Sequence, residues 1–248
     1  MHISDGVLPT WVLAAGWILT IILLIVSIVW AKKQTNNLTD RVPQIAVVTA
    51  ALFVACMFRI PVPPTSLHLM LAGLAGILLG PIAFVCVFIS LLLQAILLQF
   101  GGITVLGVNS LLMGVPALAG YVIFMLLSKA KVPSWLNGGI TSFIAVVITT
   151  ILLGIVFYVS GVDFGSLNAM LARVEGVPVL STLADILQST PGLLTFFMIF
   201  LMNIPLMIVE AIISAFIIPF IEKVKPEMLE QYKTDKANKT DKANVRDA

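Results

Sequence analysis

Charged side chains are scarce in this sequence. They make up 10% of the 248 residues, whereas apolar side chains make up 60%. Soluble domains usually contain about 25% charged and about 45–50% apolar residues, so the composition excludes an ordinary soluble domain and a disordered chain. The net charge of +2 is too small to hold the phosphates of a nucleic acid, and we expect no nucleic-acid partner. Long apolar runs fill residues 11–220, which at about 20 residues per crossing suffices for six to eight membrane helices.

The sequence also lacks the motifs of common ATPase and enzyme sites. It contains no Gly-Lys dipeptide, so the ATP-binding loop GxxxxGK[ST] is absent. It has no HExxH motif, and no Cys–His or Ser–His–Asp arrangement stands out. We therefore expect no enzyme. If the protein moves a solute uphill, an ion gradient or a separate ATPase must supply the energy.

Apolar runs divide the chain into about seven predicted transmembrane helices, which makes the predicted fold an all-α polytopic membrane protein. Gly80-Pro81 breaks a run that is too long for one crossing, because proline disfavours helix in the residue before it. The Pro-rich stretch before His68 is expected to be a loop. The predicted helices cover residues 11–30, 43–60, 68–79, 81–99, 105–127, 138–159 and 192–220.

Lys and Arg near the helix ends predict the orientation. Basic residues cluster at 32–41, 129–131 and 223–246. With seven helices these clusters share one side, which the positive-inside rule assigns to the cytoplasm. A six-helix interpretation would put the second and third clusters outside. We therefore predict an external N-terminus, an external segment at 161–189 and a cytoplasmic C-terminus.

The chain is expected to form a single transmembrane domain with a polar tail. The domain covers residues 1–222. The tail, 223–248, contains a TDKAN repeat that is too polar to form a core, so it is expected to be a disordered cytoplasmic segment.

Two histidines, His2 and His68, are both predicted on the outer side. At the second position, His2 can donate its imidazole, its own backbone nitrogen and the neighbouring amine of Met1 to one metal. Ni²⁺ and Cu²⁺ favour square-planar nitrogen sites, and His68 could complete the square. The alternative for a lone membrane histidine, a structural group with satisfied hydrogen bonds, stays open.

Four other polar residues are candidates for functional roles. Asn109 and Thr104 lie near the outer end of the fifth predicted helix, where they could hydrogen-bond a ligand or an imidazole or stabilise helix contacts. Ser66 precedes His68 and could cap its helix. Glu210 is the one carboxylate in the middle of a predicted span, and such an acid is by default a functional hypothesis. It could carry protons, act as a structural donor or contact a partner subunit.

Four stretches resemble the CbiM/NikM family, the membrane substrate-binding subunits of cobalt and nickel energy-coupling-factor (ECF) transporters. The start, MHISDGVLP, resembles the family's N-terminal signature, although Val7 replaces its usual aromatic residue. SLHLMLAGLAGILLGP places His68 twelve residues before Gly80-Pro81, as in the family. The stretches QFGGITVLGVN and NIPLMIVEAIISAF, at 99–109 and 203–216, also agree.

The resemblance implies a seven-helix fold with its N-terminal segment inserted into the bundle. It implies that Met1, His2 and His68 bind Ni²⁺ or Co²⁺ in a plane as the transported substrate, with Asn109 close by. It also implies ATP-driven import in the plasma membrane of a prokaryote. The implied partners are a small membrane subunit, a transmembrane coupling subunit, two cytosolic ATPases and membrane lipid. A proton-coupled secondary transporter using Glu210 remains the alternative, although no internal repeat supports it.

Overall fold

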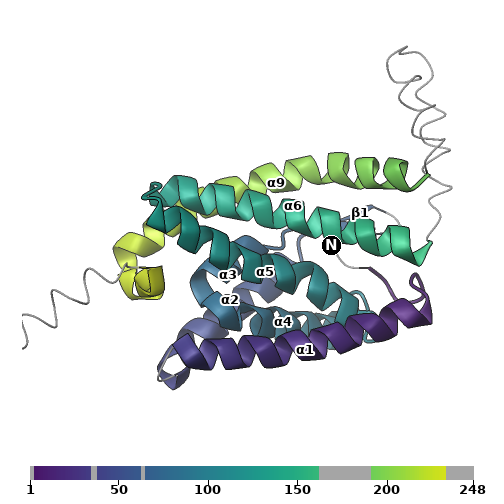
Figure 1. The fold of residues 1–248 in the computed structure, drawn as a ribbon, viewed down its shortest axis with the longest axis horizontal. Helices are drawn as coiled ribbons and strands as arrows, with labels where there is room; N and C mark the ends of the chain where they lie inside the picture. Colours follow the sequence, from purple (N-terminus) through teal and green to yellow (C-terminus); the bar gives the residue numbers. More distant parts are fainter. Residues whose placement is uncertain (1–2, 35–37, 63–64, 162–190, 233–248) are drawn as a thin grey trace, which may run out of the picture.

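A computed structural model describes residues 3–34, 38–62, 65–161 and 191–232 (Figure 1). In these ranges the chain forms a helical bundle in which α1 and α9 lie on opposite sides and α3 and α5 lie between them (Figure 1). Short 3-10 helices cover Leu38–Arg41 (η1), Gly80–Ile82 (η2) and Pro226–Tyr232 (η3). The longer elements are α1 (Thr10–Gln34), α2 (Val42–Ala55), β1 (Arg59–Val62), β2 (Thr65–His68), α3 (Ala72–Leu79), α4 (Ala83–Leu98), α5 (Leu106–Lys129), α6 (Ser134–Ser160) and α9 (Pro191–Val224).

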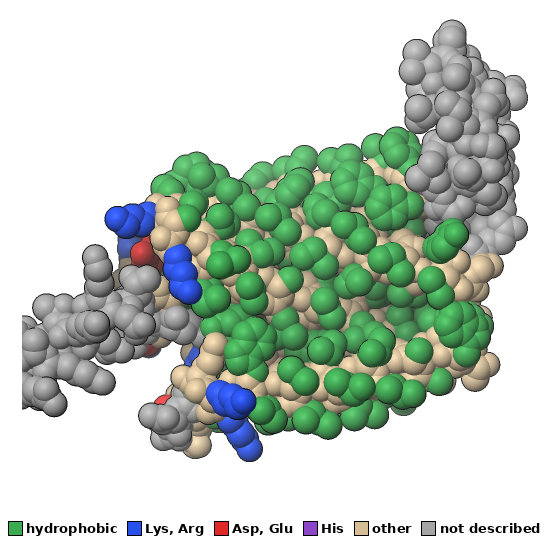
Figure 2. Space-filling model, viewed as in Figure 1, with side chains coloured by type: hydrophobic (Ala, Val, Ile, Leu, Met, Phe, Trp, Pro, Cys, Tyr) green, Lys and Arg blue, Asp and Glu red, His purple; other side chains and the backbone are tan. Residues whose placement is uncertain are grey.

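The outer surface of the bundle is apolar along its length. Figure 2 shows hydrophobic side chains covering the sides of the helices, with the visible Lys and Arg side chains gathered at one end. Six stretches of the described residues are long and apolar enough to cross a membrane. An apolar surface of this extent is unfavourable in water but suits a lipid environment, which confirms the predicted class of helical multi-pass membrane protein.

The chain reverses direction between α3 and α4, at the break predicted from Gly80-Pro81. The carbonyl of Leu78 accepts a hydrogen bond from Gln44, near the start of α2, at 2.6 Å. Ser27, in the last third of α1, donates to the carbonyl of Pro81. The apolar stretch Ala72–Leu98, which by length and composition could be one crossing, therefore consists of two helices. The described part of the chain has seven α-helices, of which α3, at eight residues, is too short to cross a membrane alone.

The prediction of a loop followed by a helix from His68 is wrong. The stretch instead forms an antiparallel hairpin in which Arg59 pairs with His68, and α3 begins at Ala72. Proline lacks the N–H that a helix interior needs, so the Pro-rich sequence favours an extended backbone. Leu71 has a φ of 48° and turns the chain from β2 into α3.

Helix α3 is buried along its whole length. Its approach to α5 is so close that a Cβ atom at Gly76 would lie 1.9 Å from the carbonyl oxygen of Ala117. Only glycine permits this distance. The small side chain at this position therefore sets how deeply α3 lies in the bundle.

Side chains from outside α3 cap its C-terminal carbonyls. Tyr232 donates to the carbonyl of Ile77 at 2.8 Å, and Arg41 joins Gln44 on the carbonyl of Leu78. The ring of Tyr232 also packs against Phe124 of α5, with centroids 4.7 Å apart. Part of the segment expected to be a tail, up to Tyr232, therefore packs on the bundle. The remainder and the segment 162–190 lie outside the described residues, and the division at residue 222 stays a prediction.

The orientation of the bundle can be tested by thiol labelling. Lys129, at the end of α5, and Gly161, just after α6, lie at opposite ends of the α5–α6 hairpin. Since the basic clusters should face the cytoplasm, we expect Gly161→Cys to react with a membrane-impermeant maleimide in intact cells and Lys129→Cys to react only after permeabilisation. The native Cys56 and Cys86 are buried and should contribute little background. The reverse pattern would contradict the orientation predicted from the charges.

Candidate metal centre

The residues before α1 enter the bundle as a non-helical segment that is held by Asn109 of α5. The Asn109 side chain accepts a hydrogen bond from the N–H of Ile3 at 2.9 Å and donates one to the carbonyl of Ile3 at 3.0 Å. Ile3 has no exposed surface, and Asn109 is 2% exposed. Both backbone groups of Ile3 are thus fixed by one side chain. This arrangement sets the position and direction of the chain one residue after His2.

A second anchor holds the same segment at Asp5. Its N–H donates to the carbonyl of Gly101 at 2.8 Å. Its carboxylate accepts hydrogen bonds from the Thr104 hydroxyl and from the N–H of Val105. Gly102 has a φ of +126°, and a Cβ atom there would lie 1.9 Å from a carboxylate oxygen of Asp5. The glycine pair and Thr104 in the sequence GGIT therefore form the binding site of the Asp5 carboxylate.

His68 is the predicted ligand that lies within the described residues. It ends β2 and is 2% exposed. Its Nδ1 atom lies 3.3 Å from the carbonyl oxygen of Leu69. A proton on Nδ1 would be donated to this oxygen and would leave the lone pair on Nε2, which is the form that a metal ligand requires.

Glu210 of α9 contacts the chain just beyond His68. Its Oε1 atom accepts hydrogen bonds from the N–H groups of Met70 at 2.6 Å and Leu71 at 3.1 Å. Glu210 has no exposed surface, and its Oε2 atom has no hydrogen-bond partner in the described part of the protein. Leu71 precedes α3 without a side-chain cap of its own. The carboxylate therefore caps α3 from another helix, where the partial positive charge of a helix N-terminus favours an anion.

The remaining predicted site residues are only partly placed. Met1 and His2 lie outside the described residues. Ser66 lies in β2 opposite Pro61, and its side chain is outside the described part. Thr104 and Asn109 both bind the N-terminal segment, so the structure brings these two predicted residues together. Within the described ranges, no three His, Cys, Asp or Glu side chains cluster as a metal site.

Sequence reasoning missed the anchoring role of Asp5. The signal for it was present, because an acidic residue lies in the N-terminal signature and a Gly-Gly turn with a nearby threonine precedes α5. The contact of Glu210 with the backbone of residues 70 and 71 carried no such signal, since every residue type except proline can donate a backbone N–H.

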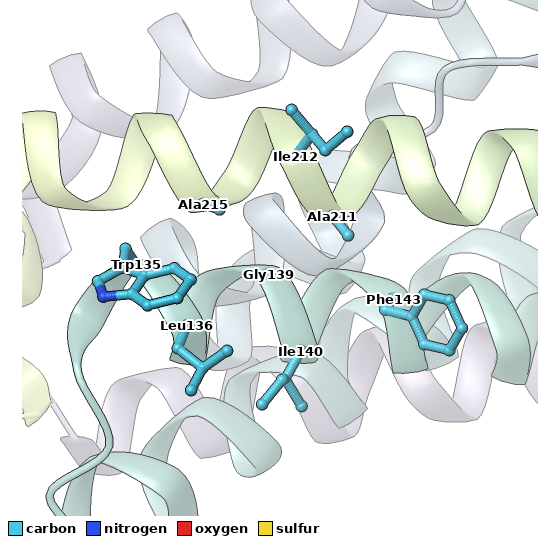
Figure 3. A pocket seen from close by; sticks show the side chains of 8 residues that line it. All are labelled: Trp135, Leu136, Gly139, Ile140, Phe143, Ala211, Ile212 and Ala215. Atoms are coloured by element: carbon cyan, nitrogen blue, oxygen red, sulfur yellow. The ribbon is translucent and has the colours of Figure 1, made fainter.

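A groove on the outer face between α6 and α9 is unsuited to a cation. It is lined by residues of both helices that include Trp135, Phe143 and Ala211 (Figure 3). The lining side chains offer no oxygen, sulfur or imidazole ligand. The polar groups that could serve a metal lie instead near residue 3 and around the start of α3.

The fold defines a multi-pass helical membrane protein in which the non-helical segment before α1 is anchored inside the helix bundle. Two solved structures share this fold. A truncated transition metal transporter has a TM-score of 0.70 at 22% identity, covering 90% of this chain and 99% of the other. A second transition metal transporter has a TM-score of 0.69 at 23% identity, covering 90% and 93%.

Sequence comparison identifies the family. Residues 2–228 match CbiM, the cobalt uptake substrate-specific transmembrane region, and the chain belongs to this family. By this family's description the chain is a substrate-specific transmembrane component of cobalt uptake, and it is located in a prokaryotic plasma membrane.

The relatives are transport proteins. One from Haemophilus influenzae, named for metal transport, is 32% identical over 92% of this chain and 97% of its own length. The cobalt transport protein CbiM of Sorangium cellulosum is 28% identical over 93% and 95%. The fused nickel transport protein NikMN of Rhodobacter capsulatus is 38% identical over 46% of this chain and 33% of its own length. These names support a transporter component rather than an enzyme.

Asn109→Leu should release the N-terminal segment. Leucine has a similar size but leaves both backbone groups of Ile3 unpaired, at a cost of about 1–3 kcal/mol for each buried group. An Ile3→Cys thiol should be protected from maleimide in the otherwise native protein and should react faster when Asn109→Leu is added. Ser110→Ala is the matched control, because among the described residues the Ser110 hydroxyl bonds within its own helix, to the carbonyl of Leu106. Equal labelling rates in all three backgrounds would contradict the anchoring role of Asn109.

Proposed function

We propose that this protein captures one Ni²⁺ or Co²⁺ ion at its outer side for import by an ATP-driven ECF transporter. The single observation that supports the proposal most strongly is the burial of Ile3, with both of its backbone groups bound by Asn109. An ordinary N-terminus lies at the surface and is poorly ordered. Here residue 3 is held inside the bundle, which suits a chain start that serves as a ligand.

The proposed ligands are four nitrogen atoms. They are the Met1 amine, the His2 amide and imidazole nitrogens, and one imidazole nitrogen of His68. Neighbouring nitrogens of one chain start form five- and six-membered chelate rings, and a strong planar field favours deprotonation of the amide. Asn109 and Asp5 fix the segment before the ion arrives, so binding loses less conformational freedom.

Both nickel and cobalt remain in the proposal. A planar field of four nitrogen atoms suits Ni²⁺, whereas the family description names cobalt and one relative is named for nickel. The ion is the cargo of the protein, so the site has to release it as well as bind it.

The energy source is proposed to be ATP hydrolysis by separate subunits. The ATP-binding loop is absent from this sequence, and the implied partners are two cytosolic ATPases, a transmembrane coupling subunit and a small membrane subunit. The alternative is a proton-coupled carrier that uses Glu210. Glu210 accepts hydrogen bonds from two backbone N–H groups, which gives it a structural role. No specific observation on the described residues favours the proton-coupled alternative.

Transport assays should distinguish the two energy sources. In vesicles, the chain alone should bind Ni²⁺ or Co²⁺ but not concentrate it, because it has no nucleotide site. With the coupling subunit, the small membrane subunit and the ATPases, uptake should require ATP and should survive collapse of the proton gradient by a protonophore. Accumulation by the chain alone that stops on addition of the protonophore would favour the proton-coupled alternative.

The chelate itself depends on a free amine at Met1. One residue added before Met1 keeps every side chain but converts the amine into a planar amide, which is a poor metal donor. We expect the extended protein to lose Ni²⁺ binding as fully as His2→Ala or His68→Ala, by equilibrium dialysis of the purified protein. An equal extension after Ala248 should have no effect. Binding should also weaken at acid pH, because protons compete for the same nitrogen atoms. Full stoichiometry and unchanged affinity after the N-terminal extension would disprove the chelate.

A further inference from the structure

Helix α3 is short, fully buried and held mainly by contacts from other parts of the chain. Its eight residues span about 12 Å, so it contributes few internal hydrogen bonds. At its C-terminal end, Arg41, Gln44 and Tyr232 satisfy its carbonyls. At its N-terminal end, the one side chain found on the backbone N–H groups of Met70 and Leu71 is Glu210.

The N-terminal end of α3 is also the end that carries His68. Two residues separate His68 from Leu71, and Leu71 holds a φ of 48°, a conformation that non-glycine residues avoid because Cβ approaches the following carbonyl. Such a conformation persists only where the surroundings impose it. The surroundings here include the hydrogen bonds from the N–H groups of Met70 and Leu71 to Glu210 and the hydrogen bond that the Leu71 carbonyl accepts from Ala75. Moving them would move the end of β2 and the imidazole that it carries.

We infer that Glu210 is a positioning residue for the metal site, which acts by fixing the backbone of residues 70 and 71 and thereby the imidazole of His68. The inference rests on the proposed function, because it takes His68 as a ligand. What it adds is the task of the buried acid in α9. The carboxylate serves as a hydrogen-bond acceptor at a fixed distance. The length of the side chain should therefore matter more for metal binding than its negative charge.

Three substitutions separate the effect of side-chain length from the effect of charge. Glu210→Gln keeps the length of the side chain and an acceptor oxygen but removes the charge. Its new amide N–H₂ would occupy the place of Oε2, which has no hydrogen-bond partner in the described part of the protein. Glu210→Asp keeps the charge but is shorter by one methylene group, so its oxygen cannot reach both N–H groups. Glu210→Met keeps the length and removes the acceptor altogether.

The experiment measures Ni²⁺ binding to the purified full chain with its native N-terminus. Affinity is obtained by competition with a chromophoric chelator, and the ligand set is followed by the visible absorption of the Ni²⁺ complex. We expect Glu210→Gln to bind within about threefold of the native protein and to keep its spectrum. Glu210→Asp and Glu210→Met should lose about 10- to 100-fold in affinity, as for other residues that orient a metal ligand. Their spectra should change, because His68 no longer completes the nitrogen set.

Ser214→Ala is the matched control on α9. Ser214 is fully buried one turn after Glu210 and accepts a hydrogen bond from Ser142 of α6 at 2.6 Å. Loss of the Ser214 hydroxyl should weaken the packing of α6 on α9 and lower the unfolding temperature without changing the Ni²⁺ spectrum. Size-exclusion chromatography and thermal unfolding identify the folded variants. Glu210→Asp withdraws the acceptor and Glu210→Met removes it. Each of these two variants that proves to be folded is compared with Glu210→Gln.

The outcomes are distinct. Loss of binding in Glu210→Gln with retention in Glu210→Asp would show that charge matters rather than reach and would overturn the inference. Native affinity and spectrum in Glu210→Asp or Glu210→Met would overturn it as well. A native protein that binds neither Ni²⁺ nor Co²⁺ would instead refute the proposed function, before any variant is compared.

Discussion

Backbone that is not helical has to find hydrogen-bond partners inside the protein when it lies at membrane depth, and the described structure is arranged around this constraint. Water is absent there, and each unsatisfied group costs several kcal/mol. Three non-helical stretches of the described chain are each held by a different set of hydrogen bonds, and the one at Ile3 is fully buried. Asn109 binds both groups of Ile3, β1 pairs with β2, and Asp5 joins the Gly-Gly turn to the start of α5. Two buried polar side chains, Asn109 and Glu210, thus bind irregular backbone, whereas others, such as Asn137 and Thr149, bond to helical carbonyls.

This constraint explains how much of the molecule the sequence could reveal. The long helices follow from apolar runs, and their observed ends lie within a few residues of the predicted ones. The reversal at Gly80-Pro81 was also predictable, because proline acts on its own neighbour. The hairpin was missed although its paired residues are close in sequence. The start of α3 was not predictable, since the hydrogen bonds on the backbone before it come from Glu210, far away in the sequence. Glu210 lies 139 residues after Leu71, and no local pattern predicts such a pair.

The residues of the candidate site were likewise predictable only in part. Asn109 and Thr104 were predictable as polar residues near the end of an apolar helix, and both bind the N-terminal segment. Their partners were not predictable from spacing alone, because the segment contacts α5 through its backbone as much as through its side chains. The resemblance to the CbiM/NikM family supplied the expectation of an inserted N-terminal segment, and the burial of Ile3 against Asn109 agrees with it.

The position of Glu210 also bears on where the transport energy comes from. A proton carrier has to exchange protons with both sides of the membrane, and so needs access to water in turn from each side. Glu210 exposes no surface, and one of its oxygens is engaged by two backbone N–H groups that hold α3 in place. Each cycle of proton release through this residue would disturb the cap of a helix that lies next to His68. A fixed acceptor that exposes no surface among the described residues fits the proposed binding component, whose energy would come from outside the chain, and the sequence has no ATP-binding loop.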